Sequence, residues 1–260
     1  MQNLFYRVVS QKFRFFAPMK KCFLLVSLLF LIHFTLTAQT QNRTGGWFAI
    51  LNSIKLSKRV TIQADFHYRT SDAWQHLQTL IIRPGIAYRF NPNFWTVLGY
   101  NHLNSRTTIS GHTSYLEENQ IWEQLWYRHP LQKFTVTHRI SFEQRFVPTA
   151  ILEGTKVKSS GSQYVNRFRY WLRFMHPFKY EKTFTQGLYG ILQEELFLNF
   201  GNISAVNAHS FDQSRTFGGL GYRFSNRIDL EIGYQYRRVQ GKGTIAFNDN
   251  LLQATTLLRL

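Results

Sequence analysis

The segment Val60-Thr61-Ile62-Gln63-Ala64-Asp65-Phe66-His67-Tyr68-Arg69 alternates strictly between apolar and polar side chains. Successive side chains of a β-strand point to opposite faces, so this segment predicts a strand with one apolar and one polar face. A soluble β-sandwich buries its apolar face in a core, whereas a membrane barrel turns that face to lipid and keeps the polar face in the lumen. The rest of the sequence favours the barrel.

Ten further segments show a similar pattern, although the alternation is poorer where Trp95, Trp122, Glu123 and Trp126 fit neither face. A tilted strand needs about 9–11 residues to cross a bilayer, while strands of globular proteins have about 5–6 residues. The long segments therefore predict an all-β fold, a single antiparallel up-and-down transmembrane β-barrel. The candidate strands span residues 46–56, 59–70, 78–90, 94–104, 119–129, 133–147, 163–177, 187–200, 214–225, 227–239 and 250–260.

Short and long connections alternate along the chain, as in outer-membrane barrels with short periplasmic turns and long external loops. Tight turns are expected at Ser57-Lys58, Asn91-Pro92-Asn93, Pro130-Leu131-Gln132 and Ser225-Asn226. The predicted long loops are residues 71–77, 105–118, 148–162, 201–213 and 240–249. This regularity supports a membrane barrel over a sandwich.

The number of candidate strands conflicts with the even strand number of most bacterial barrels. Either segment 46–56 is not a full wall strand, or an upward strand is hidden, or the N-terminal segment returns through the lumen. Within a range of about 10–12 strands, we therefore expect 10 or 12.

The N-terminus predicts a secretory signal peptide. Lys20-Lys21 precede an apolar run over residues 23–32, and Ala38 offers a cleavage site. The run is too short for a transmembrane helix, which needs about 20 residues. We expect a signal-peptide helix over 1–38, with Met19 as an alternative start, and a barrel over 39–260 in the outer membrane of a Gram-negative cell. The single cysteine, Cys22, lies in the signal, so the mature chain has no disulfide.

Charged side chains occupy the inward face of the candidate strands, with twelve arginines against five acids. Arginine is planar and donates in several directions, so it can bridge acids across a lumen. One interpretation is a structural network that pairs buried charges; the other is a pore or ligand cavity that attracts anions. A barrel of this size filled with Arg, Trp and Phe should be narrow or plugged. The predicted lumen charge network comprises Asp65, Arg69, Arg139, Glu143, Arg145, Arg167, Arg169, Arg173, Glu195, Arg223, Asp229, Glu231 and Arg237.

Other kinds of site find little support. The formal net charge of +17, or +12 without the signal, is spread one or two residues per strand and forms no nucleic-acid-binding patch. The histidines lack metal-ligand spacing. Gly218-Gly219-Leu220-Gly221 lies within a strand, where glycines relieving curvature are expected rather than a phosphate loop. His138 and Ser141 fall on opposite faces, which argues against a lipid hydrolase. We therefore expect no catalytic residue, cofactor or metal.

Four segments carry a resemblance to a known family: Gly46-Trp47-Phe48, the Arg167–Phe174 strand, the Glu194–Asn199 segment and Glu231-Ile232-Gly233-Tyr234. They resemble an uncharacterised β-barrel family of Bacteroidota (domain of unknown function 2490) over about residues 45–260. The resemblance implies export and an outer-membrane barrel. It transfers no catalytic residue.

These observations predict a non-catalytic outer-membrane barrel, structural or a narrow anion-biased solute path. The alternatives are a lipid-modifying barrel enzyme and a soluble secreted β-sandwich that binds a ligand. The expected partners are outer-membrane lipid and lipopolysaccharide, through Arg106, Lys156 and Lys158 in the predicted loops, and small anionic solutes. The sequence does not indicate an oligomeric state.

Overall fold

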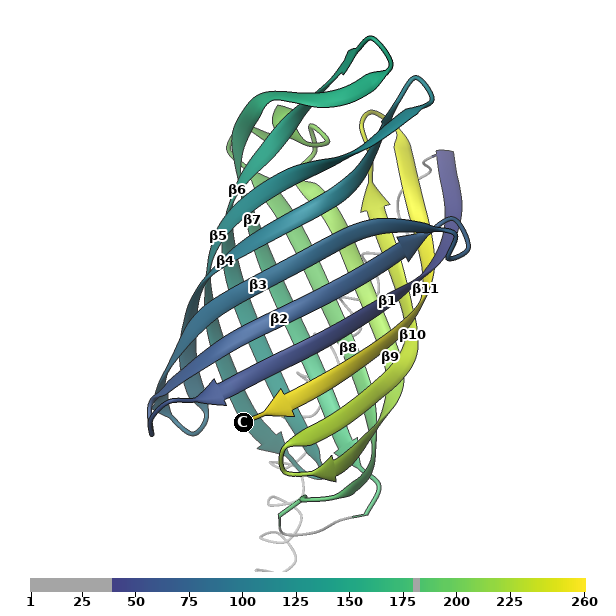
Figure 1. Cartoon of the computed structure of the whole chain (residues 1–260). Helices are drawn as coiled ribbons and strands as arrows, with labels where there is room; N and C mark the ends of the chain where they lie inside the picture. The colour runs from purple at the N-terminus through teal and green to yellow at the C-terminus, as the bar shows by residue number, and fades with distance from the viewer. Residues whose placement is uncertain (1–38, 180–182) are drawn as a thin grey trace, which may run out of the picture. The chain divides into compact units, whose positions relative to one another are not determined.

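A computed structural model describes residues 39–179 and 183–260, and the predicted signal peptide lies outside this part of the chain. The described residues form a closed barrel of eleven strands (Figure 1). A single turn of 3₁₀ helix, η2 (Ile203–Ala205), lies between β8 and β9. The strands are β1 (Gln39–Lys55), β2 (Val60–Ser71), β3 (His76–Asn91), β4 (Phe94–Ile109), β5 (His112–Leu131), β6 (Phe134–Glu153), β7 (Lys156–Pro177), β8 (Gly187–Phe200), β9 (Phe211–Ser225), β10 (Ile228–Gln240) and β11 (Ile245–Arg259).

In the described segments, no helix is long and apolar enough to cross a membrane.

Consecutive strands pair antiparallel, and the barrel closes where β1 pairs in parallel with β11, from Gln39 opposite Ile245 to Ser53 opposite Arg259. The all-β barrel and the range of about 10–12 strands are confirmed, but the expectation of an even number is wrong. Segment 46–56 belongs to a full wall strand. With an odd number of strands the first and last run in the same direction, so a parallel seam is what closes the wall.

The two ends of the barrel differ. The short-turn end carries the turns at 56–59, 92–93, 132–133 and 226–227, and Figure 1 shows the C-terminus there. The loop end is the opposite end, and it carries the connection 201–210 between β8 and β9.

Most of the predicted long loops are wrong, because the strands continue through them. Ser110-Gly111 is all that joins β4 to β5, and Gly154-Thr155 joins β6 to β7. The connections at 72–75 and 241–244 are also short, so that of the five predicted long loops only 201–213 still corresponds to a longer connection, over residues 201–210. Toward the loop end of the barrel the strands are polar on both faces, so the alternation fades while backbone pairing continues.

The faces of the strands separate as the alternation predicts. In β2 the side chains of Asp65, His67 and Arg69 are directed inward and are half-buried, while Phe66 and Tyr68 are exposed on the outside. A soluble monomer rarely exposes so much apolar surface, whereas the lipid-facing wall of a barrel requires it. Among the large exposed apolar side chains are Phe66, Ile82, Ile86, Leu98, Phe142, Leu230 and Ile232.

The tryptophans that fit neither face lie inside the barrel, and Glu123 lies outside, where it accepts a hydrogen bond from Gln144 (3.1 Å). Inward glycines on neighbouring strands make room for the rings. A Cβ atom on Gly99 would lie 2.1 Å from the Trp122 ring, and one on Gly85 2.8 Å from it. Small and large residues thus complement each other across strands.

Replacing Gly99 with alanine should therefore destabilise the barrel, because the new methyl group overlaps a ring enclosed by the lumen. We expect a loss of about 1–3 kcal/mol in the free energy of unfolding, measured by denaturant unfolding in detergent. Gly218→Ala is the matched control, since a Cβ there meets no atom within 4 Å. Equal stability of the two variants would contradict this account of the inward glycines.

Candidate functional site

The lumen contains a cavity of about 940 Å³. Its lining runs from Lys55, Arg59 and Leu260 at the short-turn end to Arg167 in the interior. The lining is strongly biased to positive charge, with thirteen basic and four acidic side chains. The basic residues are Lys55, Arg59, Arg69, Arg83, Arg89, Arg128, Arg139, Arg167, Arg169, Arg173, Arg215, Arg223 and Arg259, and the acidic ones are Asp65, Glu195, Asp229 and Glu231.

Glu195 is an acidic residue of the cavity lining that pairs with three arginines. The strand register places Arg139, Trp171, Glu195 and Arg215 in one row across four adjacent strands. As a result, one carboxylate meets Arg139 Nη2 at 2.5 Å, Arg169 Nη2 at 2.6 Å and Arg215 Nη1 at 3.5 Å. Three guanidinium groups therefore share one carboxylate.

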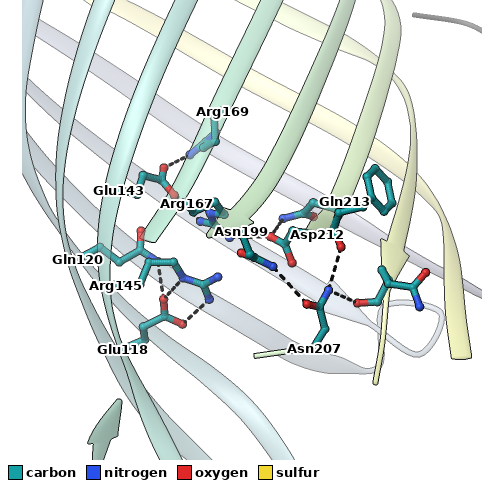
Figure 2. A network of polar contacts seen from close by, with 12 residues as sticks. Glu118, Gln120, Glu143, Arg145, Arg167, Arg169, Asn199, Asn207, Asp212 and Gln213 are labelled. Carbon is teal, nitrogen blue, oxygen red and sulfur yellow. Dashed lines mark hydrogen bonds and ion pairs between the residues drawn. The ribbon is translucent and has the colours of Figure 1, made fainter. Parts of the chain in front are cut away.

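Glu143 forms a second junction deeper in the lumen. Its buried carboxylate accepts from Arg167 Nη2 at 2.5 Å and also pairs with Arg169. Arg169 thus links the two glutamates, as Figure 2 shows for its contact with Glu143. Buried charges of this kind are stable only when they are paired and hydrogen-bonded.

A further set of polar contacts lies toward the loop end (Figure 2), and we call it the loop-end network. Its members are Glu118, Gln120, Arg145, Asn199, Asn207, Asp212 and Gln213. Arg145 Nε donates to Glu118 (2.6 Å), and Arg167 Nη1 donates to Asp212 (3.1 Å). No member lines the cavity, so the network occupies the lumen between the cavity and the loop end.

Asn207 attaches the 201–210 connection to this network. Its side chain is buried, at 6% exposure. Its amide donates to the Gln240 carbonyl (3.0 Å) and its oxygen accepts from Asn199 (3.3 Å). The connection between β8 and β9 is thereby held against the barrel wall.

All thirteen predicted network residues lie on the inner face, and eleven of them form ion pairs. Asp65 and Arg69 have no ion pair in the described part of the chain. Outside the two glutamate junctions, these residues also form the pairs Arg145–Glu118, Arg167–Asp212, Arg173–Glu231, Arg223–Asp229, Arg259–Asp229 and Arg237–Asp249.

The residues that sequence reasoning missed are Arg43, Glu118, Asp212 and Asp249. Three of them lie in segments predicted as loops, and Arg43 precedes the predicted start of the first strand. Arg43 pairs with Asp249 at 2.7 Å. The missed acids neutralise Arg145, Arg167 and Arg237 toward the loop end. The uncompensated positive charge is therefore concentrated in the cavity.

The structure also places the residues that were considered for a hydrolase, a phosphate loop or a metal site. His138 lies on the outer face, 2.8 Å from the Tyr170 hydroxyl and 3.2 Å from His129 Nε2, whereas Ser141 is buried on the inner face. Gly221 leaves room for the Tyr189 ring. Over residues 39–179 and 183–260, no three His, Cys, Asp or Glu side chains are grouped so as to hold a metal ion.

Replacing Glu195 with alanine should strongly destabilise the barrel, because Arg139, Arg169 and Arg215 lose a shared counter-charge. Breaking a buried pair from one side costs about 3–5 kcal/mol, to be measured by denaturant unfolding. The control is Glu117→Ala on the exposed outer side of β5. A loss no larger than that of the control would show that the cluster carries no net stability.

A protein family and a solved structure are similar to this chain. No curated protein sequence matches the chain. Among solved structures, a chain described as the NanC porin is similar, with 10% sequence identity and a TM-score of 0.44, over 78% of this chain and 92% of that chain. The family described as "Protein of unknown function (DUF2490)" matches residues 44–248. The chain therefore belongs to the DUF2490 family.

Proposed function

We propose that this protein is a non-catalytic outer-membrane β-barrel, exported through a cleaved signal peptide, whose lumen is a narrow solute path biased toward anions. The apolar outer wall supports the membrane location. So does closure of the strands into a ring, since a bilayer offers no water to satisfy a free strand edge.

The observation that carries the proposal is the charge of the cavity. Thirteen basic side chains face four acidic ones in its lining. Low-dielectric walls focus the field of enclosed charges, so such a lumen concentrates anions and repels cations. A network with a purely structural role would need no such excess.

The loop-end network supports a narrow path rather than an open channel. A solute moving from the cavity toward the loop end meets the Arg145–Glu118 and Arg167–Asp212 pairs and the connection held by Asn207. Passage therefore requires these contacts to part.

A structural role is the second candidate, favoured by the sharing of Glu195 and Glu143 among several arginines. Outer-leaflet lipid and lipopolysaccharide remain the proposed surroundings of the loop end. There Arg106 pairs with Asp72 (3.3 Å) and Lys158 with Glu153 (2.9 Å), while Lys156 is exposed and available to lipid phosphates.

Fractionation tests the location. The protein should sediment with outer membranes, dissolve only in detergent and migrate differently on gels with and without boiling, because a closed barrel resists unfolding by detergent alone. Intact-mass analysis should find a chain that begins near Gln39. Recovery in a soluble periplasmic fraction would contradict the proposal.

Planar-bilayer recording tests the path. The wild-type barrel should give small currents with anion preference, and Asn207→Ala should increase them because it releases the 201–210 connection. Ser210→Ala is the control and should leave the current unchanged, because Ser210 is an exposed residue of the same connection and its hydroxyl forms no hydrogen bond in the described chain. Cation preference, or large open-channel currents in the wild type, would contradict the proposal of a narrow anion path.

A further inference from the structure

Two arginines in the interior of the cavity, away from its exposed mouth, lack a polar partner. In the described residues, Arg69 on β2 and Arg83 on β3 form no hydrogen bond or ion pair with another side chain. Arg83 is only 8% exposed, and its Nε and Nη2 atoms are buried without an acceptor. The Nε atom of Arg69 is likewise buried without an acceptor. Buried donors without acceptors are costly, so these groups call for an explanation.

Neighbouring acids do not supply the missing acceptors. Glu195 is shared by Arg139, Arg169 and Arg215, and Glu143 by Arg167 and Arg169. Asp65 stands directly opposite Arg83 in the strand register but is not within ion-pair distance of it. The guanidinium groups of Arg69 and Arg83 are therefore left without an acidic partner in the described chain.

Aromatic rings hold both guanidinium groups in place. Arg69 lies over the ring of Trp47 at 4.0 Å, and Arg83 lies over the ring of Trp122 at 4.1 Å. A ring attracts the cation through its face and uses none of the in-plane N–H donors. Each arginine is thus a fixed planar fork, the geometry that binds two oxygens of a carboxylate or phosphate.

In the β2–β3 register, the backbone positions of Arg69 and Arg83 lie on either side of that of His67. Arg69 is opposite Thr79 and Arg83 is opposite Asp65, so their backbone positions differ by four residues in the β2–β3 register. At about 3.4 Å per residue this offset is roughly 14 Å. His67 lies between them on the same inner face and interacts electrostatically with both arginines. Two separate anionic groups fit this arrangement better than one.

Building on the anion-accepting lumen proposed above, we propose that Arg69 and Arg83 form a two-pronged binding site for a small ligand with an anionic group at each end. The groups are carboxylates or phosphates, which share the planar array of acceptor oxygens. The ligand enters from the short-turn end, because the cavity lining reaches that end and the loop-end network fills the other.

The mouth of the cavity supports this direction of entry. Arg89 and Arg128 there have no acidic partner in the described chain, and both contact the Trp95 ring, at 5.1 and 5.2 Å. Like the deep forks, they are held by an aromatic face and keep their charge. At the mouth of the cavity, Arg89 and Arg128 attract anions toward the interior.

Calorimetric titration of the full chain, purified in detergent at constant ionic strength, tests the site. The probes are α,ω-dicarboxylates of increasing length, the corresponding α,ω-bisphosphates and monocarboxylates of matched length. At one chain length a dianion should bind about tenfold or more tightly than the matched monocarboxylate, as expected for an added charge-assisted contact. Tighter binding by either dianion series supports the site and identifies the anionic group.

Arg69→Gln and Arg83→Gln should each reduce dianion affinity to the level of the monocarboxylate. Arg227→Gln removes the same charge from an exposed turn outside the cavity and should change nothing. Equal affinity of wild type for dianions and monocarboxylates overturns the site, even if a variant fails to fold. So does unchanged dianion affinity in both lumen variants.

The outcome is separable from that of the proposed function. Anion-biased conductance without dianion binding overturns this site and leaves the path standing. Dianion binding by a barrel without anion bias supports the site and overturns the path.

Discussion

Closure of the backbone hydrogen-bond ring is the constraint on which the rest of the structure depends. An unpaired strand edge would be prohibitively costly in a bilayer. The odd number of strands makes the seam parallel, and it is secured to its end, where Lys55 N donates to the Leu260 carbonyl and Leu260 N to the Ser53 carbonyl, both at 2.8 Å. Once the ring is closed, every alternating strand has one side directed outward and one enclosed side.

Because the barrel encloses the charged side chains, they pair with one another across neighbouring strands. Because neighbouring strands are in register, a charge on one strand meets its partner in the same row on the next, as Arg237 meets Asp249 and Arg167 meets Glu143. The acids are distributed unevenly. Toward the loop end most arginines are paired, and the polar contacts there brace the wall. Toward the short-turn end cations outnumber acids, so the two halves of the lumen differ in chemistry although they share one wall.

The alternation in β2 and β10 was enough to predict which residues face outward and which face the lumen, because period two is a local property. Strand ends were not predictable in this way. Glu118 and Asp249 lie where both faces of the wall are polar, and backbone pairing continues there without an apolar signal. The inward position of Trp122 depends on Gly85 and Gly99 in other strands, a non-local fit that no single segment reveals. The parallel seam depends likewise on both ends of the chain.

Aromatic partners explain how the lumen keeps its positive charge. A carboxylate that binds an arginine also neutralises it, whereas a ring stabilises the cation and leaves the charge in place. Trp47 contacts the unpaired guanidinium group of Arg69 in this way, at 4.0 Å, and it also contacts Arg215 and Arg237, which have acidic partners, at 5.0 Å each. The Trp122 ring packs against Gly85 and Gly99, and the Arg83 guanidinium group lies over this ring. The inward glycines leave space for the tryptophan rings, and the rings stabilise arginines that have no acidic partner. The electrostatic character of the cavity therefore follows from its packing.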